Sequence, residues 1–379
     1  MKTRLISSVG ALFKLISTSV TFFWAVHFVD IGLKGWEIGA IMAAGSITGI
    51  VFITVGGILN DRIKSKSLIS VAILMIIIQY LAVSQTDQFV TILMLFVLGG
   101  LAGSLYSISM DSLVLKTSKG ENQSEEIGLF LSLGYIGISI GMILGGHMLD
   151  KVDFNYLLRI LAMGFSIILF ISFLLPKTPI DKPQLVEYKS DILRKEVLFF
   201  ILMIFLFALH FGAEGTAYGP FLRFNLGLSM GQMGLYMGGA VGVMAISVVI
   251  FSKLIKKTSN IKWILYFGLL GSGVGFIAMS ITDNVSLSFL ARVLHEIADS
   301  AMFVFLYHGL SKFFPVERLG GNTSIVTLTT MVAGALSSIA FGYIGEKMGY
   351  EVPLIASGTI CVLAVFIAIY QRHLIAHHV

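Results

Sequence analysis

Polar breaks divide the chain into a succession of apolar, nearly uncharged runs, most of them about 20 residues long. A helix of that length, rising about 1.5 Å per residue, spans the hydrocarbon core of a bilayer. The runs lack the alternating pattern of a membrane β-barrel, so helical spans are the fitting interpretation. We predict twelve helices, over residues 8–29, 36–59, 67–85, 90–115, 126–149, 155–175, 197–222, 230–255, 262–282, 285–311, 322–345 and 353–371.

The composition agrees with a polytopic membrane protein. Of the 379 residues, 56% are hydrophobic and 12% are charged, and that charged share is about half the usual one in soluble domains. A soluble globule has too little interior to bury so much apolar surface. These proportions exclude a soluble enzyme and a nucleic-acid-binding protein, and they make the lipid bilayer a partner of the chain. The one cysteine, Cys361, allows no intramolecular disulfide and no CxxC metal site.

The basic residues predict an orientation. When the breaks are assigned alternately to the two sides, 20 of the 26 Lys and Arg residues, Lys14 among them, fall on the side of the N-terminus. Cytoplasmic loops of membrane proteins carry such an excess of Lys and Arg. We therefore expect an integral protein of the cytoplasmic (plasma) membrane with both termini cytoplasmic. Arg292 lies inside a span, and the opposite side carries five basic residues: Lys34, Lys151, Arg159, Arg223 and Lys347.

Internal repetition divides the chain in two. The segments 32–39 and 227–234 resemble each other and open the second and eighth predicted helices, and the segments 146–151 and 342–347 close the fifth and eleventh. The longest polar stretch, which holds three of the six prolines, lies between the sixth and seventh helices. Duplicated six-helix units are typical of alternating-access transporters. We expect an N-terminal bundle over 1–176, a cytoplasmic linker over 177–196 and a C-terminal bundle over 197–379.

The segment after the second predicted helix reads Gly57-Ile58-Leu59-Asn60-Asp61-Arg62-Ile63-Lys64-Ser65-Lys66. It resembles the G-x-L-x-D-R-x-G-R-[KR] signature of the major facilitator superfamily, with Lys-Ser in place of Gly-Arg. The chain resembles that superfamily over essentially its full length. The resemblance implies an all-α membrane protein with twelve transmembrane helices in two pseudo-symmetric six-helix bundles. It also implies a cytoplasmic gate built from Gly57, Asp61 and Arg62, with Asp111 of the fourth helix as a gate partner.

Ionisable side chains inside the spans gather on two helices. A charge in the hydrocarbon core costs at least ~2.5 kcal/mol, so each one needs a partner or a water-filled cavity. The resemblance implies that helices 1, 4, 7 and 10 line such a cavity, and that His27, Trp24 and Tyr218 line it too. The seventh and tenth helices carry His210, Glu214, Arg292, His295, Glu296 and Asp299. The spacings of Arg292 to Glu296 and of His295 to Asp299 predict i,i+4 pairs.

These buried groups favour proton coupling. A carboxylate between Arg and His changes its affinity for protons when its surroundings flood or close, which links proton binding to solute binding. The spacing Arg292-x-x-His295-x-x-x-Asp299 is similar to the Lys-x-x-His-x-x-Glu of the lactose-permease branch of the superfamily, which implies a proton symporter. We therefore expect a secondary active transporter that moves a small polar organic solute by alternating access, with proton-coupled symport.

Other interpretations stay open. The closest is a proton-coupled antiporter that exports drugs, lipids or metabolites. Sodium could replace the proton, with Asp299 and Glu214 as hard oxygen ligands. An intramembrane transferase using His295 and Asp299 as an acid–base pair, or a receptor that no longer transports, would need a catalytic loop or a long signalling tail. We expect no enzyme activity, no cofactor, no bound metal and a monomer.

Overall fold

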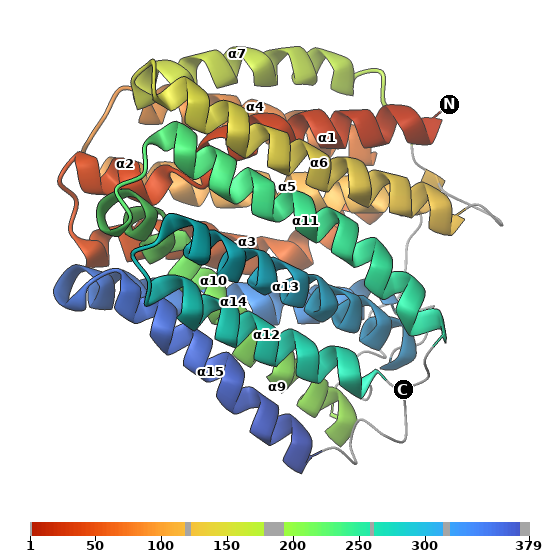
Figure 1. Cartoon of the computed structure of the whole chain (residues 1–379). Coiled ribbons are helices and arrows are strands. Elements are labelled where there is room, and N and C mark those ends of the chain that lie inside the picture. Colours follow the sequence, from red (N-terminus) through yellow and green to blue (C-terminus); the bar gives the residue numbers. More distant parts are fainter. Residues whose placement is uncertain (1, 118–122, 178–192, 258–260, 314–318, 372–379) are drawn as a thin grey trace. The chain divides into compact units, whose positions relative to one another are not determined.

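The computed structural model describes residues 2–117, 123–177, 193–257, 261–313 and 319–371. Within these ranges every regular element is a helix, which confirms the expected all-α fold (Figure 1). The expected linker over 177–196 lies mostly outside the described residues. Contacts between Cα atoms group the chain into two compact units, Met1–Pro183 with Leu228–Gly239, and Gln184–Gly227 with Ala240–Val379. We call these the first and the second unit.

The first unit is built from long helices that follow the apolar runs. α1 packs against α6 and α7, α3 packs against α5, and α4 packs against α5 and α7. The first predicted span is broken at Phe22 and Phe23, so it consists of α1 and the short α2. The helices are α1 (Lys2–Thr21), α2 (Trp24–Asp30), α3 (Gly35–Arg62), α4 (Ser65–Val83), α5 (Phe89–Thr117), α6 (Gln123–Leu149) and α7 (Phe154–Ser172).

The second unit has one strongly interrupted helix. The predicted span 197–222 is formed by α9 (Lys195–Ala208), α10 (His210–Ala213) and two π-helical turns, η1 (Glu214–Tyr218) and η2 (Phe221–Asn225). π-Helical turns are rare and often occur at functional sites. α12 packs against α13 and α15, and α10 packs against α14. The other helices are α12 (Lys262–Ser280), α13 (Val285–Phe313), α14 (Leu319–Met348) and α15 (Glu351–Tyr370); α11 (Met230–Lys257) starts in the first unit and continues in the second.

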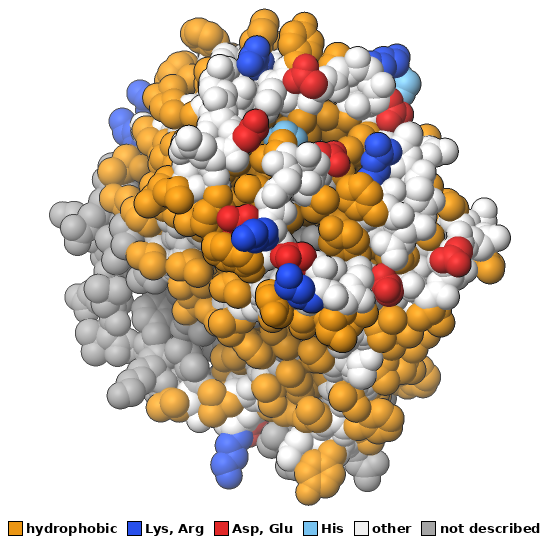
Figure 2. Space-filling model, turned by 90° about the vertical axis from the view of Figure 1, so that its left-hand side faces the viewer, with side chains coloured by type: hydrophobic (Ala, Val, Ile, Leu, Met, Phe, Trp, Pro, Cys, Tyr) orange, Lys and Arg blue, Asp and Glu red, His pale blue; other side chains and the backbone are white. Residues whose placement is uncertain are grey.

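Eleven helical stretches among the described residues are long and apolar enough to cross a membrane. The tenth predicted span corresponds to α13, which is 29 residues long and is not among them. Its middle carries Arg292, Glu296 and Asp299, and that charge sets it apart from the other long helices. In the face shown in Figure 2, acidic and basic side chains stand among many hydrophobic ones.

Glycines on α6 allow α1 to approach closely. A Cβ atom at Gly137, Gly141 or Gly145 would collide with the carbonyl oxygen of Ala11, Leu15 or Ser19, respectively. Both series advance by four residues, so one row of glycines lies along one row of α1 carbonyls. Small residues at such positions let membrane helices pack at short range.

The repeated segments share local structure as well as sequence. Gly32 and Gly227 both have positive φ, of 84° and 66°, a conformation that favours glycine. Three residues after each glycine a long helix begins, α3 or α11. The side chain of Glu37 accepts a hydrogen bond from the Lys34 amide at 2.8 Å, and that of Gln232 accepts one from the Ser229 amide at 2.8 Å. The two segments therefore start their helices in the same way.

Candidate functional site

An irregular backbone places three candidate side chains of the second unit on one row. α9 ends at Ala208, and Leu209 alone separates it from α10. His210, Glu214 and Tyr218 then follow at intervals of four residues, and Glu214 opens the first π-helical turn. The other candidate side chains lie in the middle of α13, where Arg292, His295, Glu296 and Asp299 occupy two turns.

Arg292 is the centre of an ionic cluster. Its Nη1 atom pairs with Oε1 of Glu214, and its Nη2 atom lies 2.5 Å from Oε1 of Glu296. Its Cζ atom lies 4.8 Å from the centroid of the Tyr218 ring, within the range of a cation–π contact. Arg292 is 3% exposed, so its side chain is enclosed by the protein. The predicted pair with Glu296 is confirmed.

The two histidines face a single carboxylate oxygen. Oδ2 of Asp299 lies 3.2 Å from Nε2 of His210 and 3.4 Å from Nε2 of His295, which confirms the predicted contact along α13. Nε2 of His295 is also 3.6 Å from Oε1 of Glu214. Glu214 thereby connects Arg292 with His295. We call the six residues the ionic cluster: His210, Glu214, Arg292, His295, Glu296 and Asp299.

Apolar and aromatic groups enclose the ionic cluster. Phe276 of α12 stacks on His295 with a centroid distance of 4.5 Å, and it lies edge-on to His210 at 5.7 Å. Five members of the cluster are buried, and Glu214 is the more exposed sixth. Charges about 4 Å apart interact by about 4 kcal/mol at an effective dielectric constant near 20. The energy of the site therefore depends strongly on which of its side chains are charged.

The formal charges of the ionic cluster do not balance. The cluster holds three carboxylates, on Glu214, Glu296 and Asp299, and one guanidinium, that of Arg292. With neutral histidines the net charge is −2, because three negative charges meet one positive charge. A buried excess of this size requires bound protons or another cation. His210, His295 and Asp299 also offer ligand atoms that lie within 4.8 Å of one another.

Two further candidates lie in the first unit, in an aromatic core. Trp24 is 4% exposed, and its ring centroid lies 4.9 Å from that of Phe154 and 5.1 Å from that of Phe96. The His27 ring stacks on Phe154 at 4.0 Å. Trp24 and His27 therefore both pack within the first unit, whereas the ionic cluster is built from residues of the second unit. By contrast, Tyr218 does contact the cluster, through Arg292.

The gate candidates are only partly described. Gly57, Asp61 and Arg62 belong to α3, which extends to Arg62 and so includes residues expected in a loop. Their side chains lie outside the described part of the structure. Asp111 lies on α5 and interacts electrostatically with Lys14 of α1.

Lys14 has a partner that the sequence analysis did not predict. It lies within the predicted first span, 8–29, and the structure places it on α1, in the candidate span Arg4–Asp30. A charged residue so deep in an apolar run needs a partner, and Asp111 supplies one. The signal is present in the sequence, because Lys14 stands alone among the apolar residues of that run.

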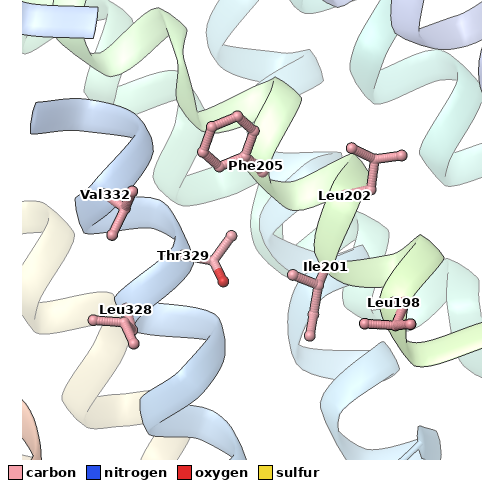
Figure 3. Close-up of a pocket in the computed structure, with 7 residues that line it drawn as sticks. All are labelled: Leu198, Ile201, Leu202, Phe205, Leu328, Thr329 and Val332. Atoms are coloured by element: carbon pink, nitrogen blue, oxygen red, sulfur yellow. The ribbon is translucent and has the colours of Figure 1, made fainter. Parts of the chain in front are cut away.

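A separate cavity of about 370 Å³ lies in the second unit between α9 and α14. Figure 3 shows its side chains on these two helices. Its walls are apolar apart from the hydroxyl group of Thr329, and none of the candidate residues lines it. The lining residues are Leu198, Ile201, Leu202, Phe205, Leu328, Thr329 and Val332.

A helical membrane protein with a buried ionic cluster is the class that fold and site define. The profile of the Major Facilitator Superfamily matches residues 6–282 and 215–374. The chain therefore belongs to the major facilitator superfamily: it is an integral membrane transporter and not an enzyme. This confirms the resemblance at the level of the superfamily, while the lactose-permease-like branch stays a prediction.

Curated relatives are distant. The quinolone resistance protein NorA of Staphylococcus aureus (strain MRSA252) is 21% identical over 271 residues, which cover 68% of each chain. NorA of strain Mu50 / ATCC 700699 is 23% identical over 149 residues, or 38% of each chain. The second match therefore spans well under half of that protein.

Solved structures share the fold over nearly the whole chain. A bacterial homolog of the human lysosomal transporter Spinster, inward-facing and occupied, superimposes with a TM-score of 0.83 at 13% identity, covering 98% of this chain and 96% of that one. The nucleoside transporter NupG gives a TM-score of 0.80 at 14% identity, covering 97% and 98%. A POT family transporter in complex with 5-aminolevulinic acid gives 0.78 at 14% identity, covering 97% and 95%. At these identities the likeness concerns the fold alone.

Proposed function

We propose that the protein is a proton-coupled secondary transporter of a small organic solute, and that the ionic cluster is its proton site. The observation that carries this proposal is the charge imbalance of the largely buried ionic cluster, in which three carboxylates accompany one arginine. A site that must take up positive charge before it is closed to water provides the coupling that a secondary transporter needs. Glu214 and Asp299 are the carboxylates on which the binding of protons depends.

The coupling follows from electrostatics. While water reaches the cluster, its excess negative charge is screened and protons can leave. When the site closes, the local dielectric falls and the unprotonated cluster becomes unfavourable. Closure is then favoured only after protons have bound, so alternating access carries protons together with the solute.

We propose inward symport of a polar solute as the direction of transport, in line with the polar character of the second unit's centre. A second candidate is export by proton antiport. It is supported by the relatives named for quinolone resistance, since removal of a drug from the cell would give resistance. Both directions use the same proton site and differ in which way a pH gradient drives the solute.

Uptake into reconstituted vesicles tests the proposal. Purified protein is screened by thermal shift against sugars, nucleosides, amino acids and a quinolone, and the best ligand is then followed in vesicles with an imposed pH gradient. In symport an alkaline lumen drives accumulation, while in antiport an acidic lumen does. A sodium gradient at equal pH on both sides tests the alternative coupling ion.

Variants connect the readout to the site. Glu214→Gln and Asp299→Asn are expected to abolish accumulation driven by the pH gradient. Glu346→Gln removes a carboxylate that pairs with Lys347 near the end of α14 and serves as the matched control. If both cluster variants leave uphill, pH-driven transport intact, the assignment of the proton site is wrong.

The remaining expectations are part of the same proposal. We propose a monomer in the cytoplasmic membrane with both termini inside, with bundles over 1–176 and 197–379, and with a cytoplasmic gate at Gly57, Asp61, Arg62 and Asp111. Single cysteines introduced near each end and probed from outside with an impermeant reagent test the orientation.

A further inference from the structure

The Nδ1 atoms of both histidines in the ionic cluster contact backbone carbonyl oxygens. Nδ1 of His210 lies 2.5 Å from the oxygen of Phe207, beside the interruption of the helix at Leu209. Nδ1 of His295 lies 3.0 Å from the oxygen of Ser272. A carbonyl oxygen can only accept a hydrogen bond, so each Nδ1 must carry a proton. The backbone thereby fixes the tautomer of both rings.

The fixed tautomer leaves each Nε2 atom as the group that gains or loses a proton. Both Nε2 atoms are buried and, among the described residues, neither makes a hydrogen bond. Both lie within ion-pair distance of the same oxygen, Oδ2 of Asp299. In a neutral ring the Nε2 lone pair would face a carboxylate oxygen without water between them, which is repulsive. When both Nε2 atoms carry a proton, each N–H group points at the Asp299 carboxylate, and both contacts become attractive.

We infer that His210, His295 and Asp299 form one proton-binding unit that holds two protons when the site is closed. Oδ2 of Asp299 faces the Nε2 atoms of both histidines, and a single proton can form a hydrogen bond between Oδ2 and only one of them. The charge of the whole ionic cluster requires the same number independently, since a net charge of −2 is neutralised by two protons. The inference rests on the proposed function and adds the number of protons and the residues that hold them.

The neighbouring groups are compatible with this count. The Ser272 hydroxyl lies 3.2 Å from Nδ1 of His295 and can accept or donate, so it adds no charge. Cys361 of α15 lies against His210 and is uncharged as a thiol. The groups that face the two histidines and Asp299 are Glu214 and Tyr218 from η1, Arg292 and Glu296 from α13, Ser272 and Phe276 from α12, and Cys361 from α15.

Nitrogen-15 NMR of histidine-labelled protein in lipid nanodiscs tests the inference directly. His210→Gln and His295→Gln identify the two rings among the eight histidines. Both rings are expected to keep a protonated Nδ1 at every pH, and both Nε2 atoms are expected to gain a proton as the pH falls. Titration of the purified protein should show one fewer bound proton in each variant than in the wild type.

Two conservative variants sharpen the test. Ser272→Ala removes the hydroxyl but leaves the carbonyl, so the tautomer of His295 should not change. Asp299→Asn offers an amide N–H to one Nε2, so one of the two histidine protons should be lost. If neither variant folds, the wild-type spectrum still decides.

The inference is overturned if either neutral ring carries its proton on Nε2, or if one ring stays neutral at all pH values. It is also overturned if a chelator changes both Nε2 signals, because a metal ion would then occupy the place of the protons. Failure here is distinct from failure of the proposed function. If the tautomers differ from those expected but pH-driven transport is intact, only the proton count is refuted. If the tautomers are as expected but the pH gradient drives no transport, only the transport mechanism is refuted.

Discussion

Glu214 and Glu296 share the guanidinium of Arg292, yet their side chains differ in exposure, at 24% and 4%. Glu296 lies on the same helix as Arg292, one turn away, whereas Glu214 reaches it from a π-helical turn of another helix. The partly exposed carboxylate of Glu214 can meet water and a solute, while the enclosed carboxylate of Glu296 can do so only if the helices separate. Two chemically identical groups therefore have different expected roles.

The first prediction concerns these two carboxylates. Glu214→Gln should reduce pH-driven transport at least about tenfold, a change of about 1.4 kcal/mol in the barrier, while leaving the thermal unfolding temperature close to that of the wild type. Glu296→Gln should mainly change stability, because it alters a buried pair. Transport in vesicles and thermal unfolding in detergent, measured on both variants, check this. Equal transport losses in both would contradict it.

The second prediction concerns Arg292. Arg292→Leu leaves the buried Glu296 and the partly exposed Glu214 without a cation, and breaking a buried pair in this way typically costs about 3–5 kcal/mol. The unfolding temperature should fall strongly. The double variant Arg292→Leu with Glu296→Gln should recover part of the loss, because one of the stranded charges is removed. A double variant no more stable than the single one would argue against the ionic account.

The third prediction concerns the ring of Tyr218. Tyr218→Phe retains the aromatic face over Arg292, whereas Tyr218→Leu removes it. The loss of a buried cation–π contact is worth about 2 kcal/mol, so the leucine variant should unfold at a lower temperature than the phenylalanine variant. Comparing the two separates the contribution of the ring from that of the hydroxyl group. A phenylalanine variant as unstable as the leucine variant would place the effect in the hydroxyl group.

The fourth prediction concerns two glycines on α6. Gly145→Ala would bring a Cβ atom against the carbonyl oxygen of Ser19, so α1 must move away, and overpacking of this kind costs about 1–3 kcal/mol. Among the described residues, a Cβ atom at Gly134 would meet no atom of a neighbouring helix within 4 Å, so Gly134→Ala on the same helix is the matched control. It should be neutral or slightly stabilising, since alanine favours helix. Equal unfolding temperatures in the two variants would refute the close approach of α1.

The fifth prediction concerns Lys14 and Asp111. Because each supplies the opposite charge for the other inside the membrane span, Lys14→Met and Asp111→Asn should each destabilise the protein. The double variant should be more stable than the sum of the two effects implies. A double-mutant cycle on thermal unfolding measures this coupling. Strict additivity would show that the two side chains act independently.

The sequence alone predicted the fold well, because hydrophobic run length determines a membrane helix almost directly. It also predicted the pairs of Arg292 with Glu296 and of His295 with Asp299, since both depend only on helical spacing. It did not predict the interruption at Leu209 or the π-helical turns, because these depend on packing against neighbouring helices. The packing of Trp24 and His27 in an aromatic core was missed for the same reason.

The interaction of Lys14 with Asp111 was not predicted for a different reason. Counting basic residues by side uses Lys14 only as a marker of topology and does not indicate its partner. Asp111, about a hundred residues later, has no sequence relationship to Lys14 that would reveal the pair. Contacts between distant segments of this kind require three-dimensional information.

The course of α11 has a mechanical consequence. Its first ten residues belong to one unit, where Ser139 of α6 donates a hydrogen bond of 2.7 Å to the carbonyl of Gly238, and the rest belongs to the other unit. A side chain at Gly238 would push the start of α11 away from α6, because a Cβ atom there would lie 2.7 Å from the carbonyl oxygen of Ser139.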